Sequence, residues 1–385
     1  MIVKDILIAL LRNAIKGEAI DMSAIEESLS SEKTATLFKV AKNHDVAHLV
    51  AYSLDKNGFE SDSDIWQAFL KEREQAVLRY EMIKADMAEI SRCFDKNAIC
   101  YIPLKGAVIR AYYPEPWMRT SCDIDILVKE QELDRAVNEL VASLGYHVDG
   151  EKTYHDISLY SPFGTHLELH HNIKENIGKF DKILTQVWAF SQKAEDISYM
   201  YVQENEFLML HLTAHMAYHF MGGGCGLRSV IDLWLLRGAL KLDEEKLRGL
   251  LKKAELEAFY DTVLSLGEYW MGENDTPTEI TLQTEKYVLL GGVYGTKKQG
   301  AVSAKIKKGS KAGYFFSRIF LPYESLAILY PVVKKHRILA PVCQIRRWLG
   351  VIFKAKRIRN EIKTVNAITD GETKEVKWLL DGLGL

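Results

Sequence analysis

Two aspartates, Asp123 and Asp125, stand one residue apart in the apolar segment CDIDILV. Side chains two residues apart on a β-strand point to the same face, so the two carboxylates are expected side by side, with Ile124 and Ile126 in the core behind them. Neighbouring carboxylates repel each other unless a cation lies between them, and oxygen ligands of this kind suit Mg²⁺ that is also held by substrate phosphates. The pair therefore indicates a divalent ion, although such a motif at a strand edge can also serve only to keep that edge soluble.

A third carboxylate, Glu168, lies later in the chain in the segment HLELH. On a strand, His166, Glu168 and His170 share one face, while the two leucines occupy the other. A charge at the centre of such an alternation is costly in a core and useful beside a metal ion. We therefore expect Glu168 to be the third metal ligand, on a strand that neighbours the DxD strand.

The elements that must position these carboxylates lie between about residues 95 and 202, where short apolar runs alternate with turn residues. A helix is expected to begin at Lys105-Gly106 and to run to Tyr113, and a second helix is expected from about Gln131 to Leu144. Strands are predicted at residues 99–104, 122–128, 146–148, 157–160 and 165–171. This order predicts a small α+β unit of roughly a hundred residues.

Helical periodicity dominates on both sides of this unit, as in Leu37, Val40 and Ala41. We predict four parts: an N-terminal helical unit (1–94), the strand-containing core (95–202), a helical substrate-side unit (203–296) and a basic helical C-terminal region (297–385). The composition, with 48% hydrophobic residues, 8 Pro and 25 Gly, excludes collagen-like and linker-rich proteins.

The segments LKGAVIRAYYPEPWMRTSCDIDILV and HLELHHN resemble an uncharacterised nucleotidyltransferase family of bacteria, which belongs to the polymerase β-like nucleotidyltransferase superfamily. The close resemblance covers about residues 95–235. It implies a polymerase β-like core with a small mixed sheet, metal binding by Asp123 and Asp125, and a site completed by Glu168, which would also assist deprotonation of the acceptor. Gly106 would let the backbone approach the triphosphate.

One departure from the family concerns the strand-to-helix turn, where better-characterised members of the superfamily carry Gly-Gly or Gly-Ser and this chain has Lys105-Gly106. The serine hydroxyl is missing. Lys105 could contact phosphate directly, and the first amides of the following helix offer an anion site. Arg119 is a second candidate for the triphosphate, or else a structural salt-bridge partner.

The resemblance implies an Mg²⁺-dependent (or Mn²⁺-dependent) transfer of a nucleoside monophosphate from ATP or another nucleoside triphosphate to a hydroxyl-bearing acceptor. Two metal ions would act in an in-line displacement of pyrophosphate. The acceptor could be a sugar, another small molecule, a protein or RNA. The alternative is a non-catalytic nucleotide-binding or antitoxin-like module that uses its basic tail to contact a nucleic acid, a membrane or a protein partner.

Three histidines, His211, His215 and His219, recur at helical spacing in LMLHLTAHMAYHF. Zinc is one interpretation, but the Glu of an HExxH motif is absent, and packed or hydrogen-bonded histidines are more common on helix faces. By the family resemblance this helix helps to close the active site. His170, His215 and Asp232 are the substrate-side candidates, and Gly222-Gly223-Gly224 is expected to end the helix.

Charge is balanced over the chain, with 50 Lys+Arg and 52 Asp+Glu, but residues 297–360 hold 16 basic residues and the single acid Glu324. Such a block fits either a nucleic acid or membrane partner, or a cap on the acidic body of the same chain. Five cysteines without a CxxC pair, and no secretory segment, predict a cytoplasmic protein, with attachment to the inner membrane surface left open. No membrane-spanning helix is expected.

Overall fold

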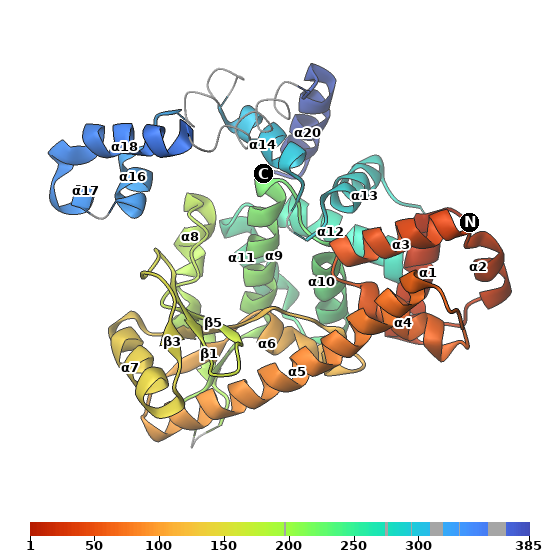
Figure 1. Cartoon of the computed structure of the whole chain (residues 1–385), viewed down its shortest axis with the longest axis horizontal. Coiled ribbons are helices and arrows are strands. Elements are labelled where there is room, and N and C mark those ends of the chain that lie inside the picture. The colour runs from red at the N-terminus through yellow and green to blue at the C-terminus, as the bar shows by residue number, and fades with distance from the viewer. Residues whose placement is uncertain (196–197, 274–275, 294, 309–318, 331, 353–366) are drawn as a thin grey trace.

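The computed structural model describes residues 1–385 except 196–197, 274–275, 294, 309–318, 331 and 353–366. Within the described ranges, N-terminal helices are followed by a five-stranded sheet with its helices and then by a series of helices that reaches the C-terminus (Figure 1). This confirms the α+β class expected from the sequence. The division into four units stays a prediction.

The N-terminal helices are α1 (Val3–Lys16), α2 (Met22–Ser28), α3 (Ser31–Asn43), α4 (Ala47–Lys56) and α5 (Asp64–Lys96). Side chains that accept a hydrogen bond from the first turn begin three of them: Asp21 for α2, Ser30 for α3 and Ser63 for α5. Helix α5, 33 residues long, packs against α4 in its first part and against α7 of the sheet unit in its last part (Figure 1). It therefore ties the N-terminal helices to the sheet.

The sheet consists of β1 (Tyr101–Pro103), β2 (Asp123–Val128), β3 (His147–Val148), β4 (Asp156–Tyr160) and β5 (His166–His170), in the order β1-β2-β5-β4-β3. Strands β2 and β5 are parallel, and the other neighbours are antiparallel. The sheet is therefore mixed, and the expected contact between the DxD strand and the HLELH strand is confirmed. Between the strands lie α6 (Gly106–Ile109), η1 (Arg110–Tyr112), η2 (Pro116–Met118), η3 (Glu130–Glu132) and α7 (Leu133–Leu144).

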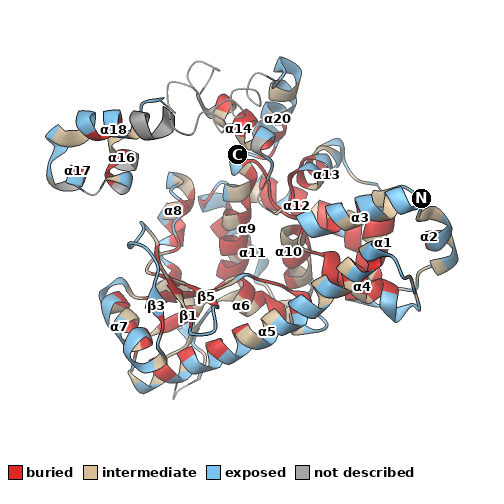
Figure 2. Ribbon diagram, in the orientation of Figure 1, coloured by how far each residue is buried: buried red, intermediate tan, exposed pale blue. Residues whose placement is uncertain are grey.

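One face of the sheet is covered by α5 and α7. Ile124, Ile126 and Val128 of β2 and Leu167 and Leu169 of β5 enter this core. The alternation along both strands therefore sends the carboxylates to the opposite face, which α9 and α10 approach (Figure 2). The expected burial of Ile124 and Ile126 is confirmed.

After the sheet come α8 (Gly178–Leu184), η4 (Val187–Phe190), the small ribbon of β6 (Ser191–Lys193) and β7 (Tyr201–Gln203), and the helices α9 (Asn205–Gly222), α10 (Leu227–Ala239), α11 (Glu244–Lys253), α12 (Glu257–Met271) and α13 (Glu279–Gly291). The largest core joins these helices to α1, α3, α4 and the first part of α5. Helix α9 ends at Gly222, as predicted. A Cβ on Gly223 would lie 2.5 Å from the backbone nitrogen of Gly300, so only glycine permits this approach.

The basic C-terminal region contains α14 (Lys297–Lys308), α16 (Tyr323–Leu329), α17 (Val332–Lys335), η5 (Arg337–Leu339), α18 (Ala340–Ile352) and α20 (Asp370–Gly382). Helix α14 packs on α9 and α20, and Lys305 Nζ lies 3.0 Å from Asp370 Oδ1. This part of the basic region therefore docks on its own chain. Helices α16 to α18 share a separate small core. In the described part of the chain, no helix has the length and apolarity needed to cross a bilayer.

Candidate active site

The three predicted carboxylates meet on the face of the sheet that lies opposite α5 and α7. In the parallel pair β2–β5, Asp123 stands opposite His166 and Asp125 stands opposite Glu168. Asp125 is buried, whereas Asp123 and Glu168 are half-buried. The register of two short strands therefore brings acids 43 to 45 residues apart in sequence to one place.

The side chains on this face form two groups that could each hold a cation. Asp123, His166 and Glu168 form one group, and Asp125, Glu168 and His170 form the other; in each, the possible ligand atoms lie within 4.8 Å of one another. Glu168 belongs to both. Within the described residues, these two groups are the ones in which at least three possible metal ligands lie together. The helix that carries His211, His215 and His219 contributes to neither group.

The donor set fits a divalent ion. Carboxylate oxygens dominate it, which suits Mg²⁺ or Mn²⁺. His170 Nδ1 is buried and has no hydrogen-bond partner in the described part of the chain, while Nε2 of the same ring lies 2.9 Å from Asp125 Oδ1. Because a carboxylate oxygen only accepts hydrogen bonds, Nε2 carries a hydrogen in this contact, and a shared cation would neutralise the carboxylates around it.

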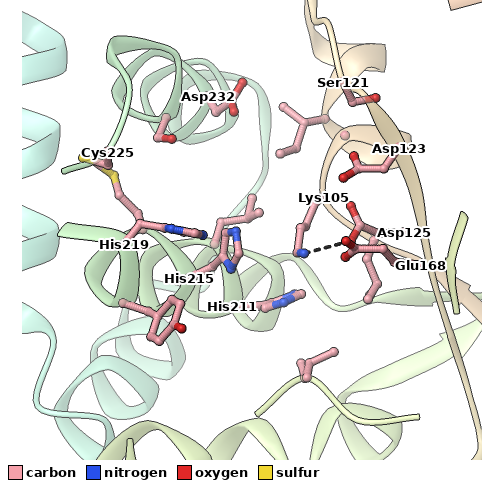
Figure 3. A pocket seen from close by; sticks show the side chains of 18 of the residues that line it. Lys105, Ser121, Asp123, Asp125, Glu168, His211, His215, His219, Cys225 and Asp232 are labelled. Atoms are coloured by element: carbon pink, nitrogen blue, oxygen red, sulfur yellow. Dashed lines mark hydrogen bonds and ion pairs between the residues drawn. The ribbon is translucent and has the colours of Figure 1, made fainter. Parts of the chain in front are cut away.

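Lys105 reaches the same carboxylates from the turn between β1 and α6. The amide of Ala107 donates to Leu104 O, and Lys105 has φ 44° and ψ −117°, which is the first central position of a type II′ turn. Glycine usually occupies this position, so the lysine is held there at a cost in backbone strain. Its ammonium nitrogen lies 2.8 Å from Asp125 Oδ1 (Figure 3).

The charges in this cluster shift one another's pKa values. Burial raises the pKa of Asp123, and the neighbouring charges of Asp125 and Glu168 raise it further, to about 6. Burial also opposes the ionisation of Asp125, but Lys105 and His170 outweigh it and hold the pKa of Asp125 far below its usual range. Burial alone would lower the pKa of Lys105, but Asp125 raises it above the ordinary value. Near neutral pH, Lys105 and Asp125 therefore form a partly buried ion pair.

A hydroxyl lies beside the turn, although the turn itself lacks the serine. A Cβ on Gly106 would meet Ser121 Oγ at 3.2 Å, so Ser121 is in close contact with the turn from the loop before β2. Arg110 Nη2 donates to this hydroxyl over 2.8 Å, and Arg110 Nε donates to Gly106 O. The sequence reasoning missed Ser121, because its only signal was its place two residues before Asp123.

Arg119 is buried and pairs with Asp232 of α10. Its Nε lies 2.7 Å from Asp232 Oδ1 and 2.9 Å from Oδ2, and the Tyr113 hydroxyl donates to the same Oδ1 over 2.8 Å. Burial alone would lower the pKa of Arg119, but Asp232 raises it. Arg119 and Asp232 both line the cavity described below, where their opposite charges pair with each other.

A second ion pair lies on the same side and includes the N-terminal helices. Arg228 Nη1 contacts Asp45 Oδ2 and donates to Thr120 O over 2.9 Å. Asp45 follows α3 and has a positive φ of 54°. Neither residue was singled out from the sequence, because nothing near Asp45 in the chain marks it as a partner of residues in the sheet unit.

Most of these residues, among them the three carboxylates, Lys105, Arg119 and Asp232, line one cavity of about 380 Å³. The carboxylates and Lys105 form one wall, and His211, His215 and His219 of α9 form the facing wall (Figure 3). His215 Nδ1 lies 2.7 Å from Glu175 Oε1, a residue that the sequence reasoning also missed. The structure therefore brings together Lys105, Gly106, Arg119, Asp123, Asp125, Glu168, His170, His215 and Asp232, although their individual roles stay predictions.

The sheet is mixed and carries a DxD strand, a third acid on the strand parallel to it and a glycine-containing turn before the DxD strand. These features define the core of a nucleotidyltransferase. The family described as uncharacterised nucleotidyltransferase matches residues 30–272, more than half of the chain. The chain therefore belongs to this family. The match begins at the residue before α3, ahead of the range expected from the sequence, and includes the helix that carries the three histidines. No curated protein matches the sequence.

Proposed function

We propose that this protein transfers a nucleoside monophosphate from a nucleoside triphosphate to a hydroxyl group of an acceptor. The observation that carries this proposal is the placement of Asp123, Asp125 and Glu168 on one face of two parallel strands, beside the Lys105-Gly106 turn. In the reaction the acceptor oxygen forms a bond to the α-phosphorus, the bond from that phosphorus to pyrophosphate breaks, and the hydroxyl proton leaves.

In this proposal Asp123, Asp125 and Glu168 hold Mg²⁺ or Mn²⁺. When bound, the divalent ions supply positive charge that stabilises the leaving pyrophosphate and lowers the pKa of the acceptor hydroxyl. The protein supplies position: the backbone at Gly106 and the hydroxyl of Ser121 face the triphosphate, and Lys105 turns from Asp125 to a phosphate oxygen when the nucleotide binds.

The proposed location is the cytoplasm, with contact to the inner membrane surface through α16 to α18. The exposed apolar side chains of this part include Ile338 by 86%, Val342 by 61% and Ile345 by 52%, and Arg337 and Arg346 are exposed beside them. Apolar side chains next to basic ones match an anionic bilayer better than they match a nucleic acid. We expect the wild type to co-sediment with phosphatidylserine vesicles. The double variant Ile338→Ser/Val342→Ser should lose this binding.

The transfer is tested with purified protein, each α-labelled nucleoside triphosphate, Mg²⁺ or Mn²⁺ and a bacterial lysate. We expect label to move onto a sugar, another small molecule, a protein or RNA with the wild type and not with Asp123→Asn/Asp125→Asn. Absence of transfer with all four nucleotides, from protein shown to be folded, would instead support the non-catalytic nucleotide-binding module.

A further inference from the structure

Glu175 and His215 form a pair on the cavity wall that faces the carboxylates. Glu175 comes from the segment between β5 and α8, and His215 comes from the middle of α9. Glu175 is buried, its Oε1 lies 2.7 Å from His215 Nδ1, and both residues line the cavity. The pair therefore places an imidazole held by a carboxylate across the cavity from Lys105 (Figure 3).

The His215 ring is held in one orientation from two sides. Glu175 engages Nδ1, and His219 packs edge-on against the ring at a centroid distance of 4.6 Å. In the described part of the chain Nε2 makes no hydrogen bond. The nitrogen that Glu175 does not use is therefore available to a molecule in the cavity.

The other histidines of α9 lack such a carboxylate. His211 Nδ1 is within hydrogen-bond distance of the Gln203 side chain, 3.2 to 3.3 Å away. His219 has ring contacts with His215 and Tyr218. Within the described residues, His215 is thus the histidine of this helix that is positioned by an acid.

The groups that face His215 come from four segments. They are Lys105 of the β1–α6 turn, Asp125 of β2, Glu168 and His170 of β5, and Glu175, together with His211 and His219 of its own helix. Burial lowers the pKa of His215 to about 3, and the Lys105 charge acts in the same direction. The ring is therefore neutral near pH 7 and its Nε2 can accept a proton, while the Glu175 carboxylate at Nδ1 stabilises the imidazolium that forms.

Glu168 is poorly placed to act as the base, because it belongs to both groups of possible metal ligands. We propose that His215 is the general base of the transfer and that Glu175 positions its ring. This inference rests on the proposed nucleotidyl transfer. The acceptor O–H bond breaks, its proton moves to His215 Nε2, and its oxygen bonds to the α-phosphorus as pyrophosphate leaves.

The test uses His215→Ala, with His147→Ala as the matched control, because His147 of β3 is exposed and does not line the cavity. Transfer of label is measured from the nucleotide that the wild type uses, with the lysate fraction that takes up the label as acceptor. We expect His215→Ala to lower kcat by about 10²-fold or more, with little change in the Mg²⁺-dependent affinity for the nucleotide. Added imidazole should restore a large part of the rate in His215→Ala and none in the control.

Glu175→Gln tests the positioning role, since it keeps a hydrogen-bonding group but removes the charge. It should lower kcat by about 10-fold, shift the pH profile of kcat and leave KM for the nucleotide nearly unchanged. Two outcomes overturn the inference when the wild type transfers label. In the first, His215→Ala retains the kcat of the wild type. In the second, His215→Ala loses activity, imidazole does not restore it, and the melting curve of the variant is unchanged. Failure of the wild type to transfer label would count against the proposed function itself.

Discussion

The ammonium nitrogen of Lys105 lies 2.8 Å from Oδ1 of Asp125, a carboxylate that the proposed metal ion would also use. The backbone of Lys105 takes a positive φ of 44° to make this contact. A positive charge therefore stabilises the carboxylate cluster before any cation binds, and in the proposed function it leaves Asp125 when a divalent ion and a nucleotide enter. This exchange links metal binding to phosphate binding through one side chain.

Replacing Lys105 by Met should tighten the binding of Mg²⁺ in the absence of nucleotide by about 10-fold, because the cation no longer competes with an ammonium group. The same change should weaken nucleoside triphosphate binding, because a phosphate loses its partner. Isothermal titration with Mg²⁺ and then with nucleotide measures both effects. Lys105→Arg keeps the charge and is the control; weaker Mg²⁺ binding in Lys105→Met would contradict the competition.

Neutralising Asp123 should stabilise the metal-free protein. Its pKa rises to about 6 because of burial and the charges of Asp125 and Glu168, so above pH 6 the ionised group is repelled in the folded state. Asp123→Asn should therefore melt at a higher temperature than the wild type above pH 6, and the difference should vanish as the pH falls to about 4. Melting curves in EDTA across this range test it. A variant that is less stable at pH 7.5 would show that the repulsion is not the governing effect.

Mg²⁺ should raise the melting temperature of the wild type. At a concentration of 100 times the dissociation constant, binding to the folded state alone contributes about 2.7 kcal/mol to the free energy of unfolding. Glu168→Gln should lose most of this gain, because Glu168 belongs to both groups of ligands. Addition of EDTA should reverse the shift in the wild type. Equal shifts in both proteins would place the ion elsewhere.

The buried pair of Arg119 and Asp232 should be needed for stability as well as for the shape of the site. Asp232→Leu leaves the Arg119 guanidinium without its carboxylate and should cost about 3–5 kcal/mol in the free energy of unfolding. Arg119→Met combined with Asp232→Leu should recover part of this loss, since neither charge is then left alone. Urea unfolding of the wild type, of Arg119→Met, of Asp232→Leu and of the double variant gives the comparison. If the double variant is as unstable as the sum of the single changes, the two residues do not act as a pair.

The histidines of α9 should make the protein less stable in acid. Burial lowers the pKa of His211 to about 3 and, with His215 nearby, that of His219 to about 4, whereas an unfolded histidine titrates near 6.5. Between these pKa values the unfolded state binds more protons than the folded state. The free energy of unfolding therefore decreases as the pH is lowered, by up to about 1.4 kcal/mol per pH unit for each histidine. The contribution is fully present above pH 6.5.

The double variant His211→Gln/His219→Gln isolates this effect. Between pH 6.5 and 4.5 its free energy of unfolding should depend less steeply on pH than that of the wild type. The difference in slope corresponds to about two fewer protons taken up on unfolding. Denaturant titrations at intervals of half a pH unit measure the slope. Identical slopes would mean that the two rings are already charged in the folded protein.

Local patterning was enough to predict the elements of the site. The alternation in CDIDILV and HLELH determined that Asp123 and Asp125 share a face, that Glu168 shares a face with His166 and His170, and that the isoleucines and leucines between them are buried. Each conclusion depends on side chains a few residues apart on one strand, where the backbone geometry leaves little freedom. The structure confirms these faces.

The tertiary structure alone decided which distant groups meet these carboxylates. Arg119 was a candidate for phosphate or for a structural salt bridge, and its guanidinium pairs with Asp232, 113 residues away. Ser121, Asp45 and Glu175 carry no recognisable spacing, because their partners lie on other elements. A periodic pattern reports only which face of its own element is buried, whereas the packing of α9 and α10 over the sheet determines which charges share a cavity.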